Sequence, residues 1–341
     1  MRKPTLFLAL AAAILILFLV NLLIGTVSIP ADTIVRILLG SDSENEIYSN
    51  IVLKSRLPQA LTSVMAGAGL AVSGLQMQVV FHNPLAGPSV LGVSNGASLG
   101  VAFVVLLSGS LGGVALSHMG YMGDAAMSVA AIVGALLVMG LILFVAQKVR
   151  GNVTLLIIGV MIGYLATAII GVLKFFSTEE DVRAYVVWGL GSFSRVSGDQ
   201  IILFVSIMCI LLPLSMLLIK TMNMLLLGED YAQNLGLNVR RARTNIILSS
   251  GILAAIVTAY CGPIMFIGLA VPHLCRAIFR TSDNRILMPS TLLVGATLAL
   301  LCNLIARFPG LEGALPVNSV TSIIGAPIIA AVIFNRQKTM R

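Results

Sequence analysis

Residues 153–173, VTLLIIGVMIGYLATAIIGVL, form a run without a single charged side chain. Crossing the hydrocarbon core of a bilayer as a helix takes about 20 apolar residues. Because a backbone in lipid must satisfy its own polar groups, such a run is expected to be helical. Similar runs at 125–147 and 201–219, in a chain that is 58% hydrophobic and 10% charged, predict an all-α polytopic membrane protein.

About ten membrane-spanning helices are predicted within one transmembrane domain that covers residues 1–341. Their expected ranges are 5–25, 58–80, 92–108, 125–147, 153–173, 201–219, 244–260, 263–279, 286–306 and 317–335. The first range is too long for the apolar part of a typical signal peptide, so we expect a retained helix. The uncharged run 244–274 contains the breaker Gly262-Pro263 and has basic residues at both ends, which favours two short crossings joined by a tight turn.

Lys and Arg are shared unequally between the two sides of this topology. One side carries seven of the 21, namely Arg36, Lys54, Arg56, Lys174, Arg183, Arg195 and Arg307. The other side includes both termini and residues 227–243, and the positive-inside rule places it in the cytoplasm. We therefore expect a multi-pass protein of the cytoplasmic (inner) membrane, surrounded by the lipid bilayer. The net charge of +8 comes from scattered loop residues, so no nucleic-acid partner is expected.

The sequence contains no recognisable motif for an energy source or a catalytic site. No Asp or Glu falls inside a predicted span, although proton- and sodium-coupled carriers usually need an ionisable group there. The sequence also lacks a GxxxxGK[ST] phosphate loop, a metal-ligand pattern and a pair of catalytic carboxylates. His273, beside Pro272, favours a structural or interfacial role. If the chain moves a solute uphill, the energy must come from a partner protein. A secondary carrier of a small solute is the alternative to such a partner-driven subunit. A membrane-embedded enzyme or an assembly scaffold is a third possible class.

Residues 227–243, LGEDYAQNLGLNVRRAR, are a compact polar segment between apolar runs. Glu229 to Leu235 is expected to form a short helix with its acids at the positive end, and Gly236 suits its C-terminal cap. Asn238 can cap a second helix that continues into the next span. The segment would form a helix–turn–helix knob with apolar anchors for a partner at Tyr231, Leu235 and Leu237. An ordinary interfacial loop is the other interpretation.

Several segments in order along the chain together resemble the FecCD family, the permease subunits of type II ABC importers for ferric siderophores, haem and cobalamin. They are Arg56-Leu57-Pro58 with AGAGLAVSGLQMQ at 66–78, HNPLA at 82–86 with Pro88 and LGVSNGASLG at 91–100, Trp188-Gly189 with Gly191-Ser192, the segment 227–243, CGPIMFIGLAVPHLCR at 261–276, and Leu315-Pro316-Val317 with Ile324-Gly325-Ala326-Pro327. Glycine-rich runs are common in membrane helices, so the ordered set carries the resemblance.

The resemblance implies a homodimer of ten-helix subunits with a pathway at its two-fold axis. It implies that two ABC ATPase subunits dock on coupling helices at about 228–241. The residues concerned are Glu229, Asp230, Tyr231, Ala232, Leu235, Gly236, Leu237 and Arg240. ATP and Mg would be used by these partners, and this chain would be a non-catalytic subunit that binds no cofactor and no metal itself.

The resemblance also implies a periplasmic or lipoprotein substrate-binding protein that docks on Arg56 and Arg307, with Gln59 where a second basic residue often follows the Leu-Pro pair. The two arginines are also compatible with anchoring lipid headgroups. A cytoplasmic gate is implied at Asn83 and Leu85, with Asn152 and Val153. From the residues alone, Asn83-Pro84 predicts a non-helical turn, which equally fits a simple interhelical connection. The expected cargo is an iron complex (ferric siderophore or haem) or cobalamin, moved into the cytoplasm.

Overall fold

The computed structural model describes residues 3–339 except 26, 41–44, 111–120, 149–151, 197 and 309–313. Within these ranges all regular structure is helical, as predicted. The α-helices are α1 Lys3–Leu23, α2 Ala31–Leu38, α3 Glu46–Ile51, α4 Leu57–Val80, α5 Val93–Ser110, α6 Tyr121–Lys148, α7 Asn152–Phe175, α8 Glu179–Gly189, α9 Asp199–Met216, α10 Ile219–Leu226, α11 Glu229–Asn234, α12 Val239–Cys261, α13 Ile267–Phe279, α14 Asn284–Ala306 and α15 Val317–Thr339. The π-helical η1 spans Val52–Arg56, and the 3-10 helices η2 and η4 span Pro88–Leu91 and Phe193–Arg195.

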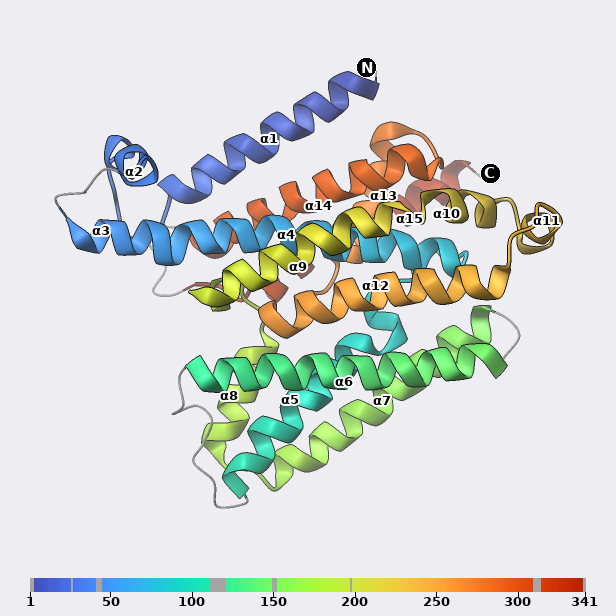
Figure 1. Cartoon of the computed structure of the whole chain (residues 1–341), viewed down its shortest axis with the longest axis horizontal. Coiled ribbons are helices and arrows are strands. Elements are labelled where there is room, and N and C mark those ends of the chain that lie inside the picture. Colours follow the sequence, from blue (N-terminus) through green and yellow to red (C-terminus); the bar gives the residue numbers. More distant parts are fainter. Residues whose placement is uncertain are drawn as a thin grey trace.

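The described helices match the ten predicted ranges in order along the chain. Six spans are long and apolar enough to cross a bilayer alone: α1, the continuous Glu46–Val80, α6, α7, α12 and α14. Helices α9 and α10 pass the same test together, and α5, α13 and α15 are shorter apolar helices. These elements correspond one to one to the ten predicted ranges, so the chain is an all-α polytopic membrane protein (Figure 1).

The run 244–274 folds as two helices, which confirms the predicted division at Gly262-Pro263. Helix α12 ends at Cys261 and α13 begins at Ile267. Between them Gly262 adopts φ of 75°, a left-handed conformation that favours glycine. A Cβ at Gly262 would also lie 2.5 Å from the carbonyl oxygen of Trp188. The turn therefore needs glycine both for its backbone angle and for space.

Several elements differ from the prediction. The helix expected at 201–219 is divided near its end, because α9 stops at Met216 and α10 starts at Ile219, with a bend of 44° between them. Hydrogen bonds from Leu217 and Leu218 back to residues three positions earlier tighten the last turn of α9. Helix α8 was not predicted at all. Its first turn holds three acids and is capped by Thr178, which accepts from Asp181 N–H at 3.3 Å.

Helix α4 occupies the centre of the molecule and is buried along most of its length. It lies between α14 and α12 in Figure 1, and it also packs on α9 and α13. A Cβ at Gly67 would lie 2.3 Å from Gly295 O, and one at Gly74 only 1.7 Å from Gly268 O. The glycines thus let α4 touch α14 and α13 backbone to backbone, a common way of packing helices in membranes.

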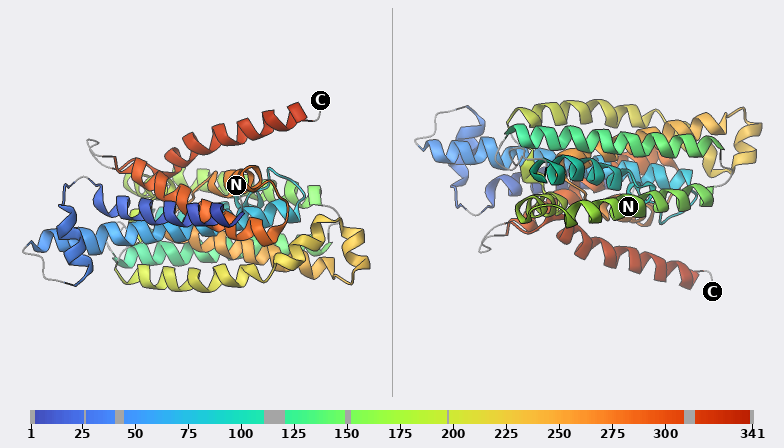
Figure 2. Two further views of the ribbon diagram at one scale, coloured as in Figure 1. Left: turned by 90° about the horizontal axis from the view of Figure 1, so that it is seen from above. Right: turned by 90° about the horizontal axis from the view of Figure 1, so that it is seen from below.

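The other helices surround this centre. Helices α5, α6 and α7 form a further layer beside α12 (Figure 1). Helix α1 runs along α14 at the periphery. It is held there by the buried Asn21, whose Nδ2 donates to Leu300 O at 3.1 Å and whose Oδ1 accepts from Asn303 Nδ2 at 2.9 Å. Helix α15 leaves the bundle at an angle, as Figure 2 shows.

Candidate functional site

The polar segment forms a compact projection, which we name the knob (residues 228–241). Helix α11 begins after Gly228, and Glu229 and Asp230 lie in its first turn. The helix ends in a Schellman motif: Leu237 N–H donates to Ala232 O at 3.0 Å and Gly236 N–H donates to Gln233 O at 2.8 Å. Gly236 adopts φ of 84°, as its predicted capping role requires. The predicted short helix and its glycine cap are confirmed.

Two contacts fix the knob to the membrane helix that follows it. The side chain of Asn238 accepts from Arg241 N–H at 3.1 Å and caps α12, as predicted. An ion pair between Arg243 of α12 and Glu229 joins the two helices of the knob. Because α12 continues from Val239 to Cys261 without a break, the knob is a rigid extension of a membrane-spanning helix.

The knob presents a mixed surface at one end of the long axis, opposite to α2 and α3 (Figure 1). Tyr231 and Leu235 are 55% and 52% exposed, and Asp230 and Arg240 are exposed beside them. Ala232 is fully buried. Leu237, expected to be a free apolar anchor, is instead half-buried and packs on the hydrophobic core, because the Schellman motif folds it back over α11. The exposed apolar anchors are therefore Tyr231 and Leu235.

Residues 82–86 form a loop with its own hydrogen bonds at the end of α4. Asn83 Oδ1 accepts from Leu85 N–H at 2.9 Å, and Ala86 N–H donates to Asn83 O at 3.1 Å. These bonds confirm the predicted non-helical turn. Leu85 is 46% exposed, whereas Ala86 is buried. The side chain of Asn83 is thus used to shape the loop, and Leu85 is its free apolar tip.

The other residues assigned to the gate lie on α7. The backbone of Asn152 and Val153 forms the first turn of that helix, and their side chains lie outside the described residues. Convergence of Leu85 and Val153 at a dimer axis remains a prediction. His273, for which a structural role was favoured, is 7% exposed, and its Nε2–H donates to Pro84 O at 2.7 Å. It therefore holds the 82–86 loop from the side of α13.

Arg56 does not present the exposed charge that its expected docking role requires. The residue is 1% exposed, and its Nη1 donates to Leu22 O at 2.7 Å and to Leu23 O at 2.9 Å. Its Nη2 donates to Val27 O. A helix ends in unpaired carbonyls and partial negative charge, so a buried cation is well placed after α1. Arg56 thus secures the C-terminal end of α1, and its burial disfavours direct docking.

Arg307, by contrast, makes no side-chain hydrogen bond or ion pair that is seen among the described residues. It follows the last residue of α14 and lines a pocket of about 290 Å³ together with Arg56, Ser192 and Ser194. Its Nη1 is buried without a hydrogen-bond partner among the described residues. Burial and the nearby charge of Arg56 lower the pKa of Arg307. Of the two arginines assigned to docking, Arg307 is the one that the geometry leaves available for an acidic group.

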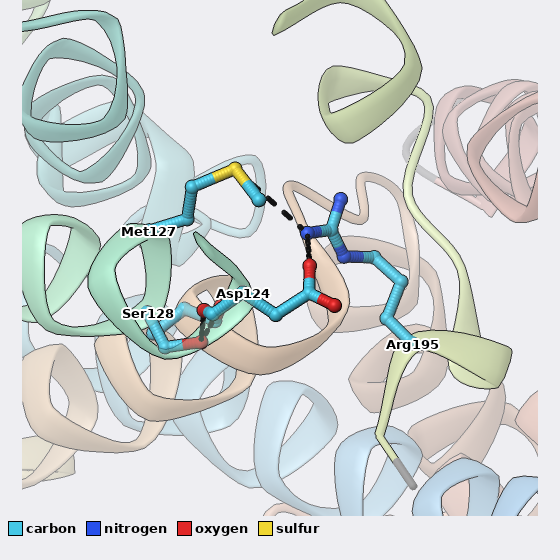
Figure 3. A network of polar contacts seen from close by, with 5 residues as sticks. Asp124, Met127, Ser128 and Arg195 are labelled. Carbon is cyan, nitrogen blue, oxygen red and sulfur yellow. Dashed lines mark hydrogen bonds and ion pairs between the residues drawn. The ribbon is translucent and has the colours of Figure 1, made fainter. Parts of the chain in front are cut away.

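An ion pair that the sequence did not reveal joins α6 to η4. Arg195 Nη2 lies 2.9 Å from Asp124 Oδ1, and Figure 3 shows both side chains pointing toward each other. Beside them Ser128 Oγ donates to Asp124 O at 3.0 Å and lies 3.3 Å from Ala259 O of α12. Helix α6 begins earlier than predicted, which brings Asp124 into the first turn of a span. The expectation that every span lacks an acid is therefore wrong at this position, where the acid is paired.

The segment 188–192, which we name the seam, connects three helices through main-chain bonds. These bonds are Ser192 N–H to Cys261 O at 2.8 Å, Val317 N–H to Gly191 O at 3.3 Å and Asn318 N–H to Leu190 O at 3.3 Å. They link the end of α8 to the end of α12 and to the start of α15. The seam lies next to the pocket of Arg307, since Ser192 and Val317 also line that pocket.

The fold is that of a multi-pass helical membrane protein, with a polar knob at one end and an arginine-lined pocket beside the seam. The chain belongs to the FecCD transport family, whose profile matches residues 13–335. It is 34% identical over 330 residues to the hemin transport system permease protein HmuU of Yersinia pestis, covering 96% of each chain. It is 36% identical over 277 residues to the vitamin B12 import system permease protein BtuC of Escherichia coli, covering 81% of each.

A solved structure shares the same fold. An inward-facing transporter assigned to the metal-chelate type of ABC transporter superimposes with a TM-score of 0.83 at 27% identity, covering 97% of this chain and 99% of the other. The family prediction made from the ordered motifs is thereby confirmed.

Proposed function

We propose that this chain is the permease subunit of an ATP-binding-cassette importer that moves an iron complex or cobalamin into the cytoplasm. The iron complex would be a ferric siderophore or haem. Relatives that cover most of the chain are described as permeases for hemin and for vitamin B12, and the structural neighbour as a metal-chelate transporter. These cargoes are large chelates, which suits a pathway shared between two subunits better than a narrow solute site within one bundle.

The observation that carries this proposal is the knob. A soluble energy-supplying subunit can move a membrane helix only through a rigid docking surface. The knob offers such a surface, because its second helix continues without a break into the rest of α12. Its exposed face combines two apolar side chains, Tyr231 and Leu235, with the charged Asp230 and Arg240. A buried aromatic or aliphatic anchor inside a polar rim is the usual composition of a strong protein–protein contact.

The assembly we propose contains two copies of this chain, two ATPase subunits and a periplasmic or lipoprotein substrate-binding protein. The ATPases bind the knobs and use ATP and Mg, while this chain remains non-catalytic. The binding protein delivers cargo at the opposite face, where Arg307 pairs with one of its acids. Both termini and the knob then lie in the cytoplasm, with the protein embedded in the inner membrane.

The decisive experiment measures ATPase binding and ATP-dependent uptake for Leu235→Asp. A charge on an apolar anchor should abolish both, whereas the matched control Asn234→Asp, an exposed neighbour on α11, should retain both. Gly236→Pro should also abolish binding, because proline cannot adopt φ of 84° and lacks the N–H that Gly236 donates to Gln233 O. Unchanged binding and uptake in both variants would refute the proposal, and ATP-independent uptake would favour a secondary carrier.

The gate is proposed at the 82–86 loop and the start of α7. Leu85 is exposed at the loop tip, so a cysteine there is accessible for crosslinking. Cysteines at Leu85 or Val153 should crosslink to the same position in the second copy in at least one nucleotide state and block uptake. Pairs that stay beyond disulfide reach in every state, with Cα atoms more than about 7 Å apart, would exclude this location.

A further inference from the structure

His82 connects the end of α4 to the helix that precedes the knob. Its Nε2 lies 2.9 Å from the carbonyl oxygen of Leu225 in α10. A carbonyl oxygen only accepts, so Nε2 carries the proton and donates it. The backbone of His82 is left-handed, with φ of 48°, which is uncommon for a residue other than glycine. The bond to Leu225 thus belongs to a defined and unusual conformation of the chain.

The carbonyl of Leu225 has a second donor. Gly228 N–H donates to the same oxygen at 3.1 Å. Gly228 is the residue before α11, where the knob begins. One oxygen atom therefore joins the 82–86 loop to the first residue of the knob. Leu225 and its neighbour Met222 are almost fully buried, so α10 is firmly packed at this point.

The opposite side of the loop is held by α13. His273 Nε2–H donates to Pro84 O at 2.7 Å. The end of α4 is tied to the same helix by Gln78, which donates to Leu269 O at 3.2 Å and accepts from Arg276 at 2.5 Å. The loop thus lies between α10, which it meets through His82, and α13, which it meets through Pro84. A displacement of α10 relative to α13 would pull on the loop through His82.

We propose that His82 is the positioning residue through which a movement of the knob reaches the 82–86 loop. This inference rests on the proposed function, in which an ATPase moves the knob and the loop seals the pathway. When the bond between His82 and Leu225 is present, the knob and the loop move as one unit. Without the bond, the knob follows the ATPase cycle while the loop keeps its place on α13.

The test compares two substitutions at this position in the full transporter reconstituted in lipid vesicles. His82→Asn keeps a residue that tolerates a left-handed backbone, but its amide ends one bond short of Nε2. His82→Gln places an amide N–H at the same bond distance from Cα as Nε2. Lys220→Asn, an exposed residue on α10, is the matched control. The quantity measured is cargo transported per ATP hydrolysed.

Loss of one hydrogen bond should lower transport per ATP roughly fivefold in His82→Asn. His82→Gln should restore it to within about twofold of the parent, and the control should match the parent. A merely structural role would lower expression and ATPase assembly without changing this ratio, and that result would overturn the proposal. Low transport per ATP in both substitutions would also overturn it. A parent that shows no ATP-dependent uptake at all would refute the proposed function instead.

Discussion

The crossing of α4 and α13 offers a sharp test of the packing, through the substitution Gly74→Ala. A Cβ at Gly74 would lie 1.7 Å from Gly268 O, 2.4 Å from Gly268 C and 2.7 Å from Gly268 Cα. These three atoms belong to the backbone, so no rotamer change can move them aside. To reach an ordinary contact of 3.4 Å, the helices must separate by about 1.7 Å.

The expected change in the free energy of unfolding of Gly74→Ala follows from two opposing effects. Overpacking a well-packed core costs about 1–3 kcal/mol, and the backbone obstacle puts Gly74→Ala at the upper end. Alanine is favoured over glycine in a helix by about 1 kcal/mol, which offsets part of this cost. We therefore expect the free energy of unfolding to fall by about 2 kcal/mol.

Thermal unfolding of the purified protein in detergent measures this loss. At about 2–4 °C per kcal/mol, the melting temperature of Gly74→Ala should fall by about 4–8 °C. The matched controls are Gly140→Ala and Gly171→Ala, because a Cβ at either helical position meets nothing within 4 Å. These controls should keep or raise the melting temperature. If Gly74→Ala melted at or above them, the backbone contact between α4 and α13 would be refuted.

Three further outcomes are expected. Arg56→Met removes three hydrogen bonds of a buried cation and should lower the free energy of unfolding by about 3 kcal/mol. Arg307→Gln should leave the melting temperature nearly unchanged and slow association of the binding protein. Equal melting temperatures of the two variants would contradict these roles. Glu229→Gln breaks the partly exposed ion pair with Arg243, which contributes about 0.5–1 kcal/mol. Binding titrations should show ATPase affinity weakened about two- to fivefold. Unchanged binding would show that the ion pair does not hold the knob in place. Hydrogen bonds, first from the backbone N–H of Arg285 and then from the side chain of Asn223, lower the pKa of Asp283. The ionised carboxylate therefore stabilises the folded protein above about pH 4, and this contribution is lost as the pH falls through the pKa of the folded state. The melting temperature of Asp283→Asn should vary less with pH than that of the parent, and parallel plots of melting temperature against pH would refute this.

Local rules were sufficient for much of the fold and for the knob. Uncharged runs of membrane length predicted the spans, and Gly262-Pro263 predicted the division of 244–274 into α12 and α13. The caps at Gly236 and Asn238 were also predicted, because each depends on the conformation or side chain of one residue and its close neighbours. Helix α8 had a similar local signal in Thr178 and its three following acids, but without an apolar run the segment was not recognised as a helix.

The contacts of Arg56 and His82 could not be predicted in the same way. Each side chain donates to main-chain carbonyls that lie far along the sequence, and every residue type carries a carbonyl. The sequence therefore holds no sign of which acceptor is used. The burial of Arg56 depends on where α1 ends in space, and the pairing of Asp124 with Arg195 depends on the approach of α6 to η4.

The seam at 188–192 bears on how far its own side chains can be changed without opening the fold. Its bonds run between main-chain atoms, so they make no demand on the side chain of Leu190, which is exposed. Ser192, by contrast, uses its Oγ to accept from Ser194 N–H at 3.1 Å and to cap η4. Only Gly191 and Gly262, with φ of 70° and 75°, are fixed by the backbone itself. Laboratory evolution can therefore exchange Leu190 over a wide range of size and polarity while the joint between α8, α12 and α15 stays closed. The seam is a joint held by main-chain bonds, at which the side chain of residue 190 is free to vary.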